Sequence, residues 1–151
     1  MPSPALFSSR AWGAWLGLLT LLFAGRVVGQ AIQCWAPQAF LPPFGAFQGS
    51  NLPYWILLPA QIVILGLMAR ASWQAGRGTF RPTPAVARLL AWGGAVYLLG
   101  ALARIAVGLT VPSAHVWFRT WIPAVFHVVL AAFVISLAVC AGRRRELKPE
   151  T

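Results

Sequence analysis

Four long apolar runs, separated by stretches rich in proline, glycine or arginine, dominate the pattern of this chain. A bilayer's hydrocarbon core is about 30 Å thick, and a helix crosses it with about 20 residues because each residue rises 1.5 Å. Each apolar run reaches that length. We therefore predict an all-α membrane protein of one domain, with four transmembrane helices in an up-down bundle. The predicted helices cover residues 11–32, 54–73, 89–111 and 121–142.

The connections between these runs differ in character. Residues 33–53 carry no charge, four prolines and several aromatic residues. Prolines at that density rule out a regular helix, and the aromatic content favours a position at the outer membrane interface, either as a lid or as a plain connector. Residues 74–88 form a solvated loop rich in glycine and arginine, and residues 143–151 form a basic tail. Pro59 should kink or loosen the second helix.

The first run has a rival interpretation as a cleaved signal peptide. Arg10 precedes its apolar core, and residues 27–29 resemble a cleavage site. Arg26 directly before that site and the length of the run argue against cleavage. Gly13, Gly17, Gly25 and Gly29 form two Gly-x-x-x-Gly pairs, a pattern that lets a neighbouring helix approach closely.

Composition and charge support the membrane assignment. Hydrophobic residues make up 59% of the 151 residues and charged residues only 9%, whereas soluble domains carry about 25% charged residues. The net charge of +10 does not indicate nucleic-acid binding, because the basic residues lie between apolar runs. They indicate topology instead. Nine basic residues fall on one side and three on or towards the other, which predicts cytoplasmic termini in a bacterial inner membrane.

Polar residues inside the apolar runs gather at one predicted depth. Arg26, Gln30, Gln61, Arg104 and His127 all lie about six or seven residues, or fewer, from the predicted outer helix ends. We call this set the polar layer and place it in the outer third of the membrane. The chain holds only two acids, Glu146 and Glu150, and both are near its C-terminus. The two arginines of the layer therefore have no carboxylate at their depth.

Three hypotheses account for the buried arginines. They can extend to the outer headgroups, pair with acids of a partner subunit, or hold a ligand such as a lipid phosphate, a carboxylate or a quinone carbonyl. Tyr97, Gly100, Arg104 and Gly108 share one helix face, and small residues beside an arginine favour an interior position. The candidate ligand-binding residues are Arg26, Gln30, Gln61, Tyr97, Arg104 and His127.

His127 has several possible roles. It can be a structural hydrogen-bonding residue, an acid or base towards a ligand, or a haem ligand. Haem with two imidazoles would require His115 as well, and no C-x-x-C-H motif is present. Two histidines without clustered cysteines or acids do not form a zinc site, so we predict no metal.

These observations favour a non-enzymatic membrane protein that binds an anionic amphiphile or a quinone-like ligand, alone or as an accessory subunit of a larger assembly. The first alternative is an enzyme that uses His127 as acid or base on a lipid-linked substrate. The second is a structural subunit whose arginines pair with a partner's acids. The expected partners are membrane lipids and a membrane protein, not nucleic acid, and the candidate cofactors are haem or a quinone.

Overall fold

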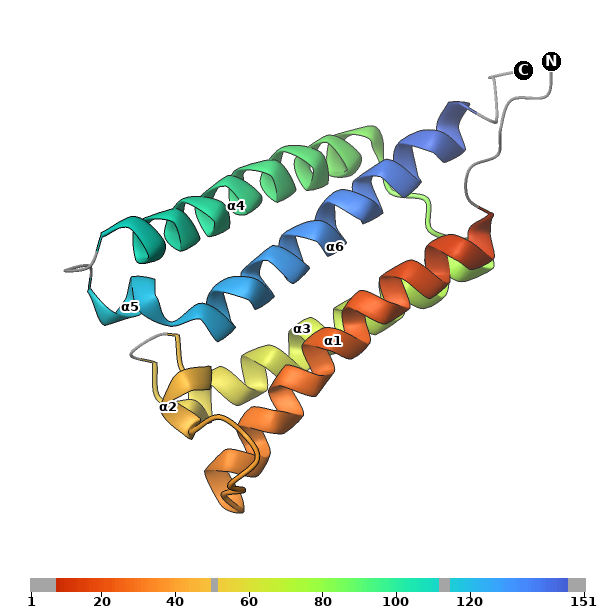
Figure 1. Cartoon of the computed structure of the whole chain (residues 1–151). Coiled ribbons are helices and arrows are strands. Elements are labelled where there is room, and N and C mark those ends of the chain that lie inside the picture. The colour runs from red at the N-terminus through yellow and green to blue at the C-terminus, as the bar shows by residue number, and fades with distance from the viewer. Residues whose placement is uncertain (1–7, 50–51, 112–114, 147–151) are drawn as a thin grey trace.

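The computed structural model describes residues 8–49, 52–111 and 115–146, apart from the side chains of residues 116–117 and 144–146. This described part is all-α and contains no strand (Figure 1). Its long helices are α1 (Ser9–Trp35), α3 (Tyr54–Arg77), α4 (Pro84–Thr110) and α6 (Trp121–Glu146), and its short helices are α2 (Phe44–Phe47) and α5 (Val116–Arg119).

All four long helices are long and apolar enough to cross a membrane, which confirms the predicted fold class. Their boundaries extend beyond the apolar runs, most clearly where α3 continues to Arg77 and α4 begins at Pro84. Arginines at those ends do not interrupt the backbone hydrogen bonds, because their side chains extend into solvent. The actual ends are set by caps rather than by loss of hydrophobicity.

Local sequence explains these caps. The Ser8 hydroxyl accepts a hydrogen bond from the Ala11 N–H at 3.2 Å, and the Thr83 hydroxyl does the same for Val86 at 3.3 Å. Pro84 is the first residue of α4, where its missing N–H costs nothing. Gly78 ends α3 with φ 76°, a left-handed conformation that favours glycine. Sequence chemistry thus defines both sides of the 78–83 connection.

The long helices form two closely packed pairs. α1 packs against α3, and α4 packs against α6. The pairs meet mainly through α1 and α6, whereas α3 and α4 have no extensive contact with each other. The order across the molecule is therefore α3, α1, α6, α4, which leaves the bundle open between α3 and α4. Short helix α2 lies over α1 and α6 at one end (Figure 1).

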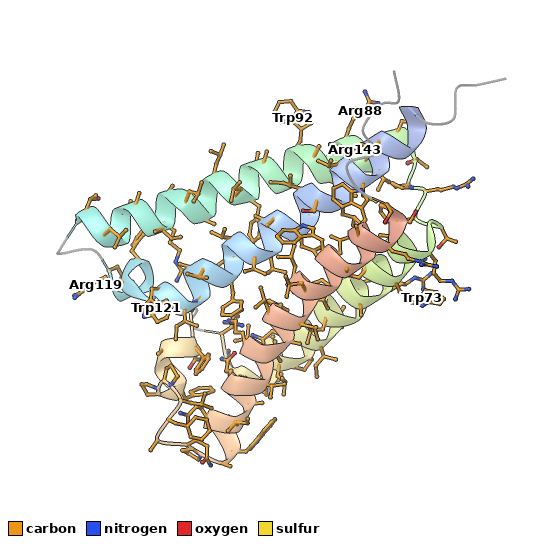
Figure 2. All side chains as sticks on the ribbon, turned by 45° about the vertical axis from the view of Figure 1, so that its right-hand side comes forward. Trp73, Arg88, Trp92, Arg119, Trp121 and Arg143 are labelled. Carbon is orange, nitrogen blue, oxygen red and sulfur yellow. The ribbon has the colours of Figure 1, made fainter. Side chains whose placement is uncertain are left out.

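Basic residues gather at one end of the molecule. Figure 2 shows Trp73, Arg88, Trp92 and Arg143 at this basic end, and Arg119 and Trp121 at the opposite end. The ends of α3 and α6 and the start of α4 therefore lie together. The tryptophans Trp73, Trp92 and Trp121 are all exposed, as residues at a membrane interface would be. That the basic end faces the cytoplasm stays a prediction from the charge count.

Small residues set the helix spacing at two points. A Cβ on Gly13 would lie 2.5 Å from the Gly76 Cα, so α1 and α3 are in backbone contact there. A Cβ on Gly94 would lie 2.8 Å from an Ile135 side-chain carbon, so α4 and α6 also approach closely. Gly17 and Gly25, by contrast, face open space. Only part of the predicted glycine motif therefore serves helix packing.

The core fills the space between α1, α3 and α6, and hydroxyl groups add bonds between helices. Trp15 donates its indole N–H to the Ser136 hydroxyl at 2.9 Å, and the hydroxyls of Thr20 and Ser72 lie 3.1 Å apart. Each of these bonds satisfies a polar group within an apolar environment. The buried core residues are Leu16, Leu19, Phe23, Val27, Met68, Ala75, Phe133, Leu137 and Cys140.

The segment after α1 is folded onto the bundle. The Gln33 amide nitrogen lies 2.9 Å from the carbonyl oxygens of Gln38, Leu41 and Pro42, and its oxygen accepts from the Gln38 N–H at 2.9 Å. The expectation of no regular helix in residues 33–53 is wrong at two places: α1 continues to Trp35, before the first proline, and α2 forms after Pro43, in a stretch without proline. Gln33 thus organises the turn that positions α2.

Candidate ligand-binding cavity

A cavity of about 280 Å³ lies where the two helix pairs diverge. All four long helices and the segment before α3 contribute to its wall. Most of the lining is apolar, with four polar side chains among it, as in typical small-molecule sites. The lining residues are Phe23, Arg26, Gly49, Leu52, Leu57, Gln61, Ile64, Tyr97, Pro123, Phe126, His127 and Leu130.

The exposure of the lining residues locates the mouth of the cavity. Phe23, Gln61 and Pro123 are buried and form its floor. Leu52 is 50% exposed and Tyr97 is 39% exposed, so the mouth lies near these two side chains. Leu52 lies two residues before the start of α3 and Tyr97 belongs to α4, and these two helices do not pack together. The cavity therefore opens on the side that would face lipid.

Arg26 is the charged group of the cavity. Its Nη2 donates to the Phe47 carbonyl oxygen at 2.9 Å, and the centre of its guanidinium lies 5.7 Å from the Phe126 ring centroid. The second distance is within the range of a cation–π interaction. The Nε of Arg26 is buried and has no hydrogen-bond partner in the described structure. The side chain therefore points inward and keeps donor capacity for a ligand.

Tyr97 and His127 form a pair across α4 and α6. The Tyr97 hydroxyl and the His127 Nδ1 share a hydrogen bond, and the two rings meet edge to face at a centroid distance of 5.6 Å. This bond fixes the imidazole orientation and occupies one of its two nitrogens. The other nitrogen, Nε2, remains for a ligand in the cavity that His127 lines.

Gln30 and Gln61 form a buried amide pair between α1 and α3. The Gln61 Nε2 donates to the Gln30 Oε1 at 3.2 Å. Both side chains are almost inaccessible, at 0% and 3% exposure. The Gln61 Oε1 and the Gln30 Nε2 are buried without hydrogen-bond partners among the described residues. Because only Gln61 lines the cavity, Gln30 acts behind it by holding its amide.

Arg104 does not line the cavity, although it is only 4% exposed. Its Nη2 donates to the Thr120 hydroxyl at 2.9 Å, just before α6 begins. Tyr97, seven residues or about 10 Å earlier on α4, is level with His127 instead. The start of α6 is level with Arg104 and not with the end of α4. Arg104 therefore lies about two helical turns from the level of Tyr97 and His127, towards the end of α4. A Cβ on Gly49 would lie 3.5 Å from its Nη2, so the guanidinium adjoins the cavity wall.

The charged side chains in and beside the cavity wall are both positive. Arg26 lies in its wall and Arg104 lies just above. Glu146, at the far end of α6, is 19 residues or about 28 Å along the helix from His127. The described residues contain no group of three or more His, Cys, Asp or Glu side chains that could hold a metal ion. His115, the second imidazole of the haem hypothesis, is exposed and does not line the cavity.

The sequence did not indicate every contributor to the site. The Phe47 carbonyl is a backbone group, and residue type says nothing about where it points. Gly49 leaves room for α6, since a Cβ there would lie 2.5 Å from the Pro123 Cβ. Phe126 stacks on Arg26 one residue before His127. Its position directly beside a residue of the polar layer is the one signal that could have found it.

The fold and the cavity together indicate a multi-pass membrane protein whose two helix pairs line a mostly apolar pocket with four polar side chains. A scan against protein-family models and searches of curated proteins and of solved structures found no match for this chain. Its function is therefore argued from the cavity alone.

Proposed function

We propose that this protein binds the head group of a membrane amphiphile in the cavity, without catalysing a reaction on it. The observation that carries this proposal is Arg26, whose guanidinium lines an apolar-walled cavity and has a buried, unpartnered Nε. A partly buried charge without an opposite charge beside it is costly, which favours a ligand that compensates it.

The cavity volume limits what it holds. An apolar cavity of about 150 Å³ accepts a benzene molecule, whereas sites for drug-sized ligands begin at about 300 Å³. At about 280 Å³, the cavity has room for a head group or one substituted ring, and none for an acyl chain. The acyl chain of the ligand would leave through the mouth beside Leu52 and Tyr97 and lie along α3 and α4 in the lipid.

The proposed setting is the outer half of a bacterial inner membrane. Its support is the excess of arginine at the end opposite to the cavity, which favours a cytoplasmic position for that end. The protein acts alone or as an accessory subunit, and its exposed apolar faces would contact lipid or a partner.

Native mass spectrometry of protein purified in a mild detergent tests the proposal. The wild type should retain a small molecule. Ile64→Trp places a bulky side chain into the cavity and should abolish retention. Leu67→Trp makes the same kind of change on the same helix at a position that is 64% exposed, and should leave retention unchanged.

Three outcomes would count against the proposal. An empty wild-type protein, or equal retention in Ile64→Trp, would overturn the cavity as a binding site. Chemical conversion of the retained molecule by wild type, but not by His127→Gln, would establish the enzyme alternative. That alternative is favoured by one observation, the hydrogen bond between Tyr97 and His127 that orients the imidazole.

A further inference from the structure

We propose that the ligand is a monoanionic amphiphile, whose phosphate or carboxylate group binds Arg26 and whose hydroxyl, where it has one, binds Gln61. This inference rests on the proposed function, because it names the chemical class of the molecule that the cavity holds. It excludes a neutral quinone as the main ligand, which the sequence alone left open.

The first reason to expect an anionic ligand is the positive charge in the cavity wall. Arg26 contributes a full positive charge to an apolar wall, and its described partners, the Phe47 carbonyl and the Phe126 ring, are both neutral. A neutral ligand would displace water from this guanidinium and leave its charge uncompensated. An anion would compensate the charge in the same step. The guanidinium fork also matches phosphate and carboxylate oxygens, since it donates two parallel hydrogen bonds.

The second reason is that Arg26 has N–H groups left to donate to a ligand. The Phe47 carbonyl accepts one of the five N–H groups of the guanidinium, and the Nε–H remains buried without a partner. Phosphate and carboxylate oxygens are the strongest acceptors of such donors. His127 adds a donor in the tautomer where Tyr97 donates to Nδ1, because Nε2 then carries the proton. The two residues that carry these donors line the same cavity.

The side-chain amide of Gln61 is the reason to expect a hydroxyl on the ligand. Its unpartnered oxygen is buried in a residue that lines the cavity floor. A hydroxyl both donates and accepts, so it satisfies this amide in either orientation of the Gln30–Gln61 pair. A quinone carbonyl can only accept. An anionic head group that carries hydroxyls, such as a glycerol phosphodiester, therefore satisfies more of the cavity than a quinone ring does.

Titration of delipidated protein, followed by native mass spectrometry, tests this class. The probes are dioleoylphosphatidylglycerol, oleate, dioleoylphosphatidylcholine and decylubiquinone. The two anionic probes should bind about tenfold or more tightly than phosphatidylcholine, whose choline cation offsets its phosphate charge and leaves the charge of Arg26 uncompensated. About tenfold is the factor expected for one charge-assisted interaction. Phosphatidylglycerol binding tighter than oleate would identify a hydroxyl-bearing lipid head as the source of the anion, and equal binding would identify the anionic group alone.

The matched variants are Arg26→Gln and Arg119→Gln. Both remove one positive charge, and Arg119 is an exposed arginine at the cavity end of the molecule (Figure 2). Arg26→Gln should abolish the preference for anionic probes, whereas Arg119→Gln should keep it. If Arg26→Gln does not fold, Arg26→Lys keeps the charge without the fork. It should weaken phosphatidylglycerol binding several-fold and retain selectivity over phosphatidylcholine.

The outcomes separate this inference from the proposed function. Equal binding of phosphatidylcholine or decylubiquinone that Ile64→Trp still blocks would overturn the anionic class while leaving the cavity as a binding site. Binding of every probe that Ile64→Trp does not affect would overturn the proposed function itself. Equal anion preference in Arg26→Gln and wild type would also overturn the assignment of the anionic group to Arg26.

Discussion

Single polar side chains in and beside the cavity wall set its chemistry, and the hydrogen bonds described for them go to uncharged groups. Arg26 donates to a backbone carbonyl, Arg104 to the Thr120 hydroxyl, and His127 pairs with Tyr97. Hydrogen bonds of this kind are modest individually, but leaving a buried partner unpaired is costly. The loss of stability caused by a substitution should therefore depend on whether one hydrogen-bond partner or both are replaced.

The amide pair provides one such prediction. Gln61→Leu leaves the Gln30 amide buried without its partner and should lower the free energy of unfolding by about 1–3 kcal/mol. The double variant Gln30→Leu with Gln61→Leu removes both polar groups and should cost less than Gln61→Leu alone. Chemical denaturation of ligand-free protein in detergent, followed by circular dichroism, measures both. A double variant that is less stable than the single one would show that the amides contribute more than mutual satisfaction.

Two glycines on α4 provide a second prediction. A Cβ on Gly108 would lie 2.2 Å from the Phe118 carbonyl oxygen, whereas Gly100 has nothing within 4 Å. Gly108→Ala should therefore lower the free energy of unfolding by about 1–3 kcal/mol through overpacking. Gly100→Ala, the matched control, should be neutral or stabilising by up to about 1 kcal/mol because alanine favours helix. Thermal unfolding of both variants measures the difference, and equal melting temperatures would contradict the close contact of α4 with α5.

At the scale of elements, the predictability of this structure depended on what each pattern encodes. Apolar runs identified the four long helices, because membrane thickness demands them. Their ends were less predictable, since Gly78 caps α3 after a last turn that contains Arg77, and Thr83 caps α4 before its first turn. Helix faces could not be assigned from apolar periodicity, because spanning helices are apolar all round. Only the intramembrane polar residues marked the interior.

The candidate site was also predictable only in part, and Arg104 is the residue whose position could not be predicted. The sequence indicated Arg26, Gln61, Tyr97 and His127, and the structure brings these four around one cavity. Depth counted from helix ends placed Arg104 in the same layer. The count did not include the offset between the end of α4 and the start of α6, which α5 connects.

The turn after α1 provides a third prediction. Gln33→Leu removes the hydrogen bonds that its amide makes with the carbonyls of residues 38, 41 and 42, and should loosen residues 36–49. Amide hydrogen exchange there should accelerate about tenfold or more, with α1 and α3 unchanged. Gln38→Ala is the control, because its exposed side chain bonds only the Ala36 carbonyl. Unchanged exchange in Gln33→Leu would contradict a role of Gln33 in positioning α2.

At the scale of the whole molecule, charge and cysteines allow a test of orientation. Cys34 is exposed in the last turn of α1, at the end of the molecule opposite to the basic end, and Cys140 is buried near the basic end of α6. If the basic end is cytoplasmic, a membrane-impermeant maleimide should label Cys34 in intact cells, and Cys34→Ala should abolish labelling. Labelling that appears only after the membrane is permeabilised would reverse the predicted topology.

The division into two helix pairs has a consequence for biosynthesis. α1 and α3 can pack through Gly13 and Gly76 as soon as both have left the ribosome, before α4 and α6 exist. At that stage Arg26 lacks Phe126, and the cavity lacks the walls that α4 and α6 supply. The proposed binding site is therefore complete only when α4 and α6 have inserted and packed against α1 and α3. Occupancy of the cavity would report that membrane assembly of the chain is complete.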